Sequence, residues 1–236
     1  MAGRIFNSAI FLSLIMILLG CEYPAVPPPG IDYTGEIDTI VDIDGNKYKT
    51  VGIGTQIWMA QNLKVTRLND GTEIPEAADN EEWRTPRTPK YCWYNNDSVS
   101  HQRYYGPLYN FYAVNTGLLC PVGWHVPGKS EWTTLAKYLG GYGKAAGKLK
   151  DYNGNFWMGP NNCIENNFGF AALPGGVRHD FNGVFYQIGT NGYWWTASNK
   201  DEFRAYIVSM QNESMMLNEN ESRQGDGYSV RCVKDQ

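Results

Sequence analysis

The chain has no run of lysine and arginine and only three histidines, and both features limit its chemistry. Its 236 residues include 20 Lys and Arg against 24 Asp and Glu, for a net charge of -4. Nucleic-acid binding depends on clustered positive charge, so we expect no nucleic-acid partner. His101, His125 and His179 form no H-x-H or H-E-x-x-H spacing, and no C-x-x-C pair occurs, so no metal site is predicted.

Common catalytic motifs are also missing. The sequence contains no G-x-S-x-G and offers no recognisable Ser/His/Asp set. Residues 123–130, "GWHVPGKS", match the phosphate-loop pattern, but Pro127 removes one of the backbone N–H groups that such a loop needs. We interpret this segment as a turn and a helix cap, and we expect no nucleotide partner.

The apolar run near the start is too short to span a bilayer, which takes about 20 residues. Residues 10–19 follow Arg4 and fit the apolar core of a secretory signal. They end in "LLGC", which resembles the lipobox of bacterial lipoproteins. The resemblance implies cleavage before Cys21 and a lipid on its sulfur, so residues 1–20 are interpreted as a lipoprotein signal peptide. Plain secretion with an unmodified Cys21 is the alternative.

A proline-rich segment follows the expected lipidation site. Four prolines among residues 21–37 favour an extended, semi-rigid linker. We therefore predict an exported domain at residues 38–236, anchored through lipid to the outer membrane. The sequence leaves the membrane leaflet open, and exposure at the cell surface is one of the two outcomes.

Aromatic residues and glycine are abundant in the expected domain. The chain has 14% aromatic residues and 26 glycines. "TIVDIDGNKYKTVGIG", residues 39–54, predicts a hairpin that turns at Asp44-Gly45. Further β-rich runs separated by turn residues occur from residue 168 onward, so the pattern predicts one α+β domain made of loop-rich antiparallel strands.

Two main helices and a short third one are predicted. The first covers residues 107–116, with Gly106 as its cap and Pro107 at its first position. The second follows Gly128, whose N–H is expected to bond to Glu131, and buries Trp132 and its neighbours on one face. The short third helix falls within residues 144–151.

Several blocks of sequence resemble the Fibrobacter succinogenes major paralogous domain. They include "DIDGNKYKTVGIGTQIWMAQNLKVTRLNDGTEI", "YGPLYNFYAV", "LCPVGWHVPGKSEW", "GFAALPGG", "GYWWTAS" and "GYSVRCVKD". This family occurs in exported proteins and lipoproteins of Bacteroidetes and Fibrobacteres and has no established biochemical activity. The resemblance implies a C-type-lectin-like fold, as in formylglycine-generating enzymes and in the variable ligand-binding proteins of diversity-generating retroelements.

The cysteines after position 21 number four, and an even number in an exported chain predicts two disulfides. Spacing alone leaves all three pairings open. The "LCP" and "VRC" cysteines recur in the family pattern, so the resemblance implies a Cys120–Cys232 bridge, with Cys92–Cys163 as the remaining pair.

The candidate ligand-binding residues come from two arguments. Tyr193, Trp194 and Trp195 follow an Asn-Gly turn and could stack on sugar rings, although at least one of the two tryptophans is expected in the core. The retroelement proteins bind ligand on the segment equivalent to residues 198–223. Within it we select Asn199, Arg204, Tyr206, Gln211 and Asn212. A merely solvated hairpin is an equal alternative for this segment.

These observations predict a lipid-anchored module for non-catalytic recognition of a polysaccharide or of another surface protein. The alternatives are a structural or assembly role in the cell envelope, and an enzyme related to formylglycine-generating enzymes. No cofactor is expected. Calcium stays open because lectin-like loops often bind it, although the sugar-binding signatures of C-type lectins are absent.

Overall fold

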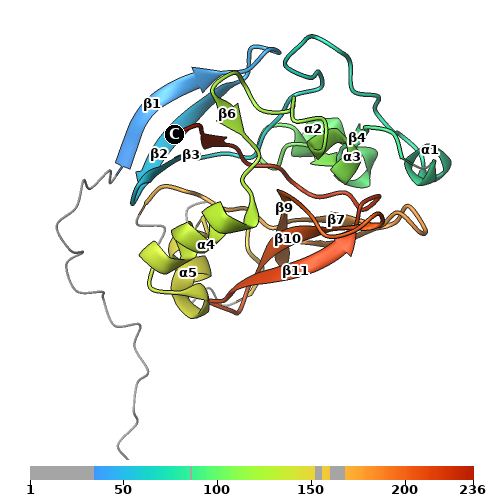
Figure 1. Ribbon diagram of the computed structural model, residues 1–236. Helices are drawn as coiled ribbons and strands as arrows, with labels where there is room; N and C mark the ends of the chain where they lie inside the picture. Colours follow the sequence, from blue (N-terminus) through green and yellow to red (C-terminus); the bar gives the residue numbers. More distant parts are fainter. Residues whose placement is uncertain (1–34, 86, 152–155, 160–167) are drawn as a thin grey trace, which may run out of the picture.

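A five-stranded and a three-stranded antiparallel sheet form the framework of the protein (Figure 1). The structure is a computed structural model, and it describes residues 35–85, 87–151, 156–159 and 168–236. The larger sheet has the order β1-β2-β3-β12-β6, and the smaller sheet has the order β11-β10-β9. Two short two-stranded ladders, β4-β5 and β7-β8, complete the set in the described residues. The predicted α+β class is confirmed at this level.

The elements have the following bounds. The strands are β1 Gly35–Val41, β2 Lys47–Ile53, β3 Gln56–Met59, β4 Tyr91–Cys92, β5 Leu108–Tyr109, β6 Trp124–His125, β7 Gly175–Arg178, β8 Phe185–Ile188, β9 Asn191–Asn199, β10 Arg204–Gln211, β11 Leu217–Arg223 and β12 Val233–Lys234. The helices are α1 Asn80–Arg84, the 3-10 turn η1 Tyr94–Asn96, α2 Ser98–His101, α3 Phe111–Val114, α4 Lys129–Tyr138 and α5 Tyr142–Leu149.

The predicted hairpin at Asp44-Gly45 is confirmed as the β1–β2 pair. Its turn is organised by the Asp42 carboxylate, whose Oδ1 accepts the backbone N–H groups of Asp44 and Asn46, each at 2.9 Å. Gly45 adopts a φ of 84°, a backbone conformation that glycine enters without steric cost. The DIDGN segment therefore needs no metal ion to account for its residues.

The last strand closes the larger sheet. β12 pairs with both β3 and β6, so the last strand lies in the same sheet as the first strands that the structure describes (Figure 1). The Cys120–Cys232 bridge lies next to this junction, with a sequence separation of 112 and 6.0 Å between the two Cα atoms. The pairing implied by the family resemblance is present in the structure.

The prediction of a second bridge, Cys92–Cys163, has to be corrected. Cys92 is a free, buried thiol, and Cys163 lies outside the described residues. Cys92 sits on β4 in a small apolar cluster with Trp83, Tyr94 and Leu108, where its side chain completes the packing. Burial raises the pKa of the Cys92 thiol to about 12 even though Arg178 opposes this shift, so the thiol is chemically inert at neutral pH.

The predicted second helix forms as α4. Gly128 is its N-cap, and the backbone N–H of Gly128 donates to Glu131 Oε2 at 2.7 Å. The helix cap at Gly128 is confirmed, whereas Trp124–His125, within the segment interpreted as a turn, forms strand β6. Trp132, Leu135 and Ala136 face inward, and the Trp132 ring packs between those of Trp58 and Trp194. The short third helix is α5, whose bounds are Tyr142–Leu149.

The helix predicted from residue 107 is wrong in its first half. Leu108 and Tyr109 form strand β5 and pair with β4, and the helical turn α3 begins only after Asn110. The Asn110 Oδ1 accepts the N–H of Ala113 at 3.1 Å and so caps α3. Tertiary pairing overrides the helical pattern here, because Tyr109 pairs with Tyr91 of β4 and exchanges backbone hydrogen bonds with Tyr228.

The predicted signal peptide, residues 1–20, falls outside the described residues, as do Cys21 and most of the predicted linker. Within the described part of the chain, no helix has the length and apolar character needed to cross a bilayer.

Candidate functional site

The two tryptophans selected from the sequence are core residues. Trp194 and Trp195 are both fully buried, and they point to opposite sides of β9 because side chains alternate along a strand. Each indole N–H has an internal acceptor, Asn62 Oδ1 for Trp194 and the Tyr109 carbonyl for Trp195. Neither ring is available to a ligand, so both are corrected to structural residues.

Tyr193 lies partly exposed at the same sheet. Its hydroxyl donates to Gln187 Oε1 at 2.6 Å and accepts from Asn191 Nδ2 at 3.0 Å. Its ring packs on Tyr228. Tyr193 is therefore positioned by neighbours on β8 and β9, with part of the ring facing solvent.

The candidates on β10 separate into two groups. Arg204 and Tyr206 lie near its start, whereas Gln211 ends it and Asn212 follows. The strand spans eight residues, so about 20 Å lies between its ends. Asn212 Nδ2 donates to the Met158 carbonyl at 2.7 Å, and the Gln211 carbonyl accepts from the Lys150 ammonium. The structure therefore does not bring Gln211 and Asn212 together with Arg204.

Tyr206 is covered rather than open. The Lys129 ammonium lies 3.6 Å from its ring centroid, and that of Lys200 lies 5.6 Å away. Both lysines also pair with glutamates of β11, Glu219 and Glu221, at 2.8 Å each. These ammonium groups and their glutamate partners cover part of the Tyr206 ring, which is half-buried.

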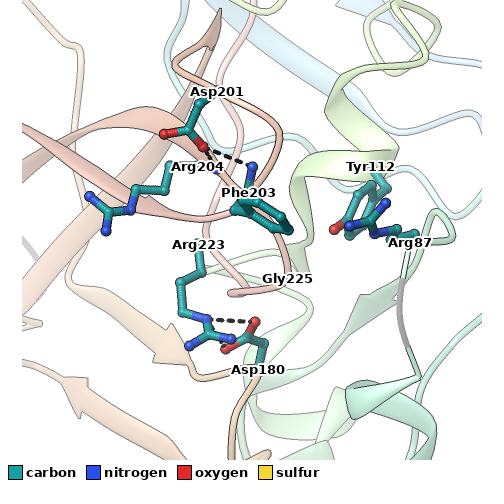
Figure 2. A pocket seen from close by; sticks show the side chains of 8 residues that line it. All are labelled: Arg87, Tyr112, Asp180, Asp201, Phe203, Arg204, Arg223 and Gly225. Carbon is teal, nitrogen blue, oxygen red and sulfur yellow. Dashed lines mark hydrogen bonds and ion pairs between the residues drawn. The ribbon is translucent and has the colours of Figure 1, made fainter.

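A cavity of about 690 Å³ lies beside the β9–β10 turn. It draws its lining from separate parts of the chain, namely Arg87, Tyr112, Asp180, Asp201, Phe203, Arg204, Arg223 and Gly225. Figure 2 shows Phe203 between Arg204 on one side and the Tyr112–Arg87 pair on the other. Phe203 is 61% exposed, so most of its side chain is open to solvent at the edge of the cavity.

The turn that presents Phe203 is fixed by hydrogen bonds. Asp201 Oδ1 accepts the backbone N–H groups of Phe203 at 2.8 Å and of Arg204 at 2.9 Å. The buried Gln224 amide donates to Asn199 Oδ1 and to the Asp201 carbonyl. Asn199, a sequence candidate, thus helps to hold this turn.

Two of the lining arginines face each other across neighbouring strands. Arg204 on β10 is the register partner of Arg223 on β11. Arg223 Nε pairs with Asp180 Oδ1 at 2.9 Å, whereas Arg204 Nη1 makes a longer contact of 3.5 Å with Glu221 Oε2. The cavity therefore has a wall that carries two arginines from register-paired positions, with the Arg204 guanidinium directed to Glu221 and the Arg223 guanidinium directed to Asp180.

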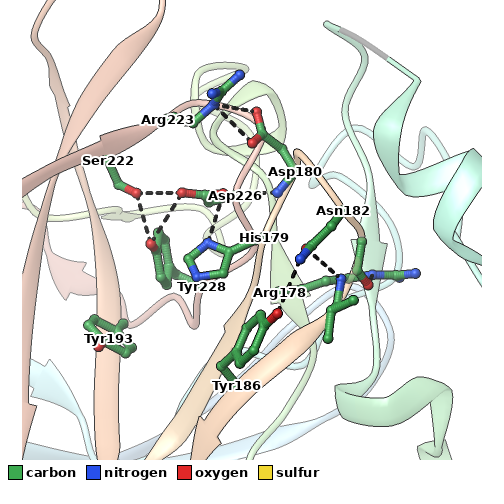
Figure 3. A network of polar contacts seen from close by, with 12 residues as sticks. Arg178, His179, Asp180, Asn182, Tyr186, Tyr193, Ser222, Arg223, Asp226 and Tyr228 are labelled. Carbon is green, nitrogen blue, oxygen red and sulfur yellow. Dashed lines mark hydrogen bonds and ion pairs between the residues drawn. The ribbon is translucent and has the colours of Figure 1, made fainter.

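A polar network connects this wall to the β7–β8 hairpin (Figure 3). Asp226 lies at its centre and is almost completely buried. Its Oδ1 accepts the Asp180 N–H at 2.9 Å and lies 3.4 Å from His179 Nδ1, while its Oδ2 accepts from Ser222 Oγ at 2.7 Å. These contacts hold the loop that carries Asp180 against the end of β11.

The charges in this network shift one another. Burial alone would raise the pKa of Asp226, but its hydrogen bonds with His179, Ser222 and the Asp180 N–H lower it. The hydrogen bond to Asp226 outweighs burial and raises the pKa of His179. Burial, helped by the nearby Asp226, raises the pKa of Asp180.

The network does not have the geometry of a serine nucleophile. A triad requires the serine hydroxyl to bond to the imidazole, with the carboxylate behind it. Here Ser222 Oγ donates to Asp226 itself, and Tyr228 OH lies 2.8 Å from Ser222 Oγ. The group therefore acts as a positioning network for the cavity wall.

Exposed rings continue beyond this network. The His179 ring lies 5.5 Å from that of Phe181 and 5.3 Å from that of Tyr186, centroid to centroid. Phe181 is 58% exposed, and Asn182 Nδ2 donates to the Tyr186 hydroxyl at 3.1 Å. Apolar ring faces and polar edges thus lie next to each other beside Asp180.

The chain matches a family model over most of its length. The model describes the Fibrobacter succinogenes major domain (Fib_succ_major), and it aligns with residues 51–234. The chain belongs to this family. No curated protein and no solved structure shows a significant match to the chain. The Fib_succ_major match covers the cavity, the Asp226 network and both ends of the Cys120–Cys232 bridge.

Most cavity residues of this Fib_succ_major domain were not selected from the sequence. Arg204 is a sequence candidate that lines the cavity, and the candidate Asn199 holds the adjacent turn. Phe203 and Arg223 lie in the same segment but are not among the candidates. The phenylalanine in the polar run "SNKDEF" is a local signal that could have indicated a binding surface. Arg87, Tyr112 and Asp180 come from distant segments, and nothing local distinguishes them.

The described part of the Fib_succ_major domain contains no group of three or more His, Cys, Asp or Glu side chains arranged to hold a metal ion. Calcium binding therefore stays a prediction without a candidate site in those residues.

Another cavity, of about 570 Å³, has Glu73, Glu76 and Tyr91 in its lining. Tyr91 OH donates to Glu76 Oε2 at 3.1 Å, so part of its polar lining is already satisfied.

Proposed function

We propose that this protein is an exported, lipid-anchored recognition module that binds a polysaccharide without transforming it. The cavity beside Phe203 is the proposed ligand site. The observation that carries the proposal is the exposed Phe203 ring, held by a hydrogen-bonded turn at the mouth of a cavity rich in donors and acceptors. Sugars are bound in proteins by such pairs of apolar ring faces and polar groups.

The finer description of the fold is also a proposal. A C-type-lectin-like arrangement is supported by the return of the terminal strand β12 to β3, and by a bridge that ties the segment before α4 to that strand. A loop-presented site on a sheet framework agrees with such a fold, because binding residues concentrate on loops that a rigid scaffold positions.

Binding is preferred to catalysis for a specific reason. An enzyme resembling formylglycine-generating enzymes would need a reactive cysteine pair. Cys120 and Cys232 are bridged and buried, and the Cys92 thiol is buried with a raised pKa. These cysteines are suited to stability rather than to redox turnover.

The test is a glycan array probed with the full chain in detergent, followed by affinity measurements on the Phe203→Ala variant. Loss of ring stacking is expected to weaken binding of any array hit by about tenfold, which corresponds to about 1.4 kcal/mol. Tyr104→Ala is the matched control, because Tyr104 is an exposed ring that does not line the cavity.

An unchanged affinity for Phe203→Ala would contradict the location of the site. Capture of envelope proteins together with an empty array would instead favour the assembly role.

A further inference from the structure

The cross-strand pair of Arg204 and Arg223 is an unfavourable arrangement in the protein by itself. Two like charges directly opposite each other on neighbouring strands repel. Both side chains are more than half exposed, at 60% for Arg204 and 65% for Arg223, so solvent screens much of the repulsion. An anionic group that both side chains could reach would offset the repulsion that remains.

The two arginines differ in how strongly the protein already engages them. Arg223 is held by Asp180 at 2.9 Å, with its Nε as the donor. Arg204 has a single long contact of 3.5 Å to Glu221, and the other oxygen of Glu221 is bound by Lys200 at 2.8 Å. A guanidinium has five N–H donors, so Arg204 retains most of its capacity for a ligand.

The remaining charged groups of the lining are already paired within the protein. Arg87 contributes a third guanidinium, which lies 5.6 Å from the Phe203 ring centroid. The two lining carboxylates are already engaged, Asp180 by Arg223 and Asp201 by backbone N–H groups. Arg87 is paired with Glu202 at 3.2 Å, as Arg223 is with Asp180 at 2.9 Å, so Arg204 is the lining cation that the protein itself engages least.

We propose that the cavity binds a saccharide that carries a carboxylate or sulfate group, with that group accepted by Arg204 and Arg223 and its sugar ring placed on Phe203. This inference rests on the proposed function and specifies its ligand class. The planar guanidinium fork matches the two oxygens of a carboxylate or sulfate, which a lysine would engage only as a point charge.

The experiment compares four probes by isothermal titration calorimetry with the full chain in detergent. Polygalacturonate supplies carboxylates, dextran sulfate supplies sulfate esters, dextran is the neutral glycan, and polyglutamate is an acidic chain without sugar. At least one acidic glycan is expected to bind about tenfold or more tightly than dextran, and its affinity should fall as NaCl rises. The better of the two acidic glycans identifies the anionic group.

Arg204→Gln is expected to lower that affinity at least about tenfold, because a charge-assisted hydrogen bond is lost. Arg204→Lys should recover only part of the loss. Arg103→Gln is the control, since Arg103 is an exposed arginine that stacks on Tyr104 and does not line the cavity. Its affinity should equal that of the unmodified chain.

The outcomes separate this inference from the proposed function. Phe203-dependent binding of a neutral array glycan that Arg204→Gln leaves unchanged would overturn the acidic ligand class and keep the polysaccharide site. Binding of polyglutamate alone would overturn both. If neither acidic glycan binds, the inference is wrong, and the array result then decides the proposed function independently.

Discussion

Replacing both Cys120 and Cys232 with alanine is expected to lower the free energy of unfolding by about 4–5 kcal/mol. The bridge closes a loop with a sequence separation of 112 residues, and the chain-entropy relation gives about 4.7 kcal/mol for a loop near 100 residues. Folded domains are stable by only about 5–15 kcal/mol, so the loss would consume a large part of that margin.

The assay is urea unfolding followed by tryptophan fluorescence, with the free energy obtained by linear extrapolation. Cys92→Ala is the control, because it removes a buried cysteine without opening a loop. Reduction of the unmodified chain should produce a loss of similar size to that of the double variant. A loss below about 2 kcal/mol in both experiments would refute the loop-closure argument, and would mean that the β12 pairing alone holds the chain end.

Two further predictions concern pH and backbone geometry. Burial disfavours the His125 imidazolium, but hydrogen bonds to Asp235 and Glu131 outweigh it and raise the pKa of His125 above 6.5. The resulting stabilisation is complete below pH 6.5 and is lost as the pH rises through the pKa of His125 in the folded protein. The urea midpoint should therefore fall less between pH 5.5 and 8.5 in His125→Gln than in the unmodified chain. An identical fall in both would show that His125 is not the source of the pH dependence. Gly106→Ala should cost about 2 kcal/mol or more, because φ is 71° and a Cβ would lie 2.7 Å from a backbone oxygen. Gly117→Ala is the matched control, because Gly117 has the same φ but open space around it. Its smaller loss of unfolding free energy in the same urea assay measures the backbone strain alone. Equal losses for the two variants would show that the chain moves to avoid the close contact at position 106.

The fold was predictable wherever local signals and tertiary packing agree. The Asp44-Gly45 hairpin and the cap of α4 depend on residues within a few positions of one another, and both were confirmed. The helix expected from residue 107 failed because its apolar spacing also suits a short strand, and pairing with β4 decided between them. Local periodicity alone could not have shown that partner.

The candidate site was less predictable than the fold. Aromatic residues in a strand signal either core or surface, and alternation cannot assign the inward face when both faces are covered, as they are for Trp194 and Trp195. The polar run at residues 217–223 has no strand pattern of its own, yet it forms β11 because β10 supplies its hydrogen-bonding partner. That pairing is what places Arg223 opposite Arg204.

The sequence by itself determined the family, the mixed α/β class with antiparallel strands, the hairpin and helix caps, and, through the family pattern, the pairing of Cys120 with Cys232. These features are encoded by short-range residue chemistry or by motifs that keep their order along the chain. Tertiary structure decided which aromatic rings are buried, that Cys92 is free, and that Arg87, Asp180 and Phe203 line one cavity. Such contacts depend on how separate segments pack, and packing is set by long-range complementarity that no local pattern records.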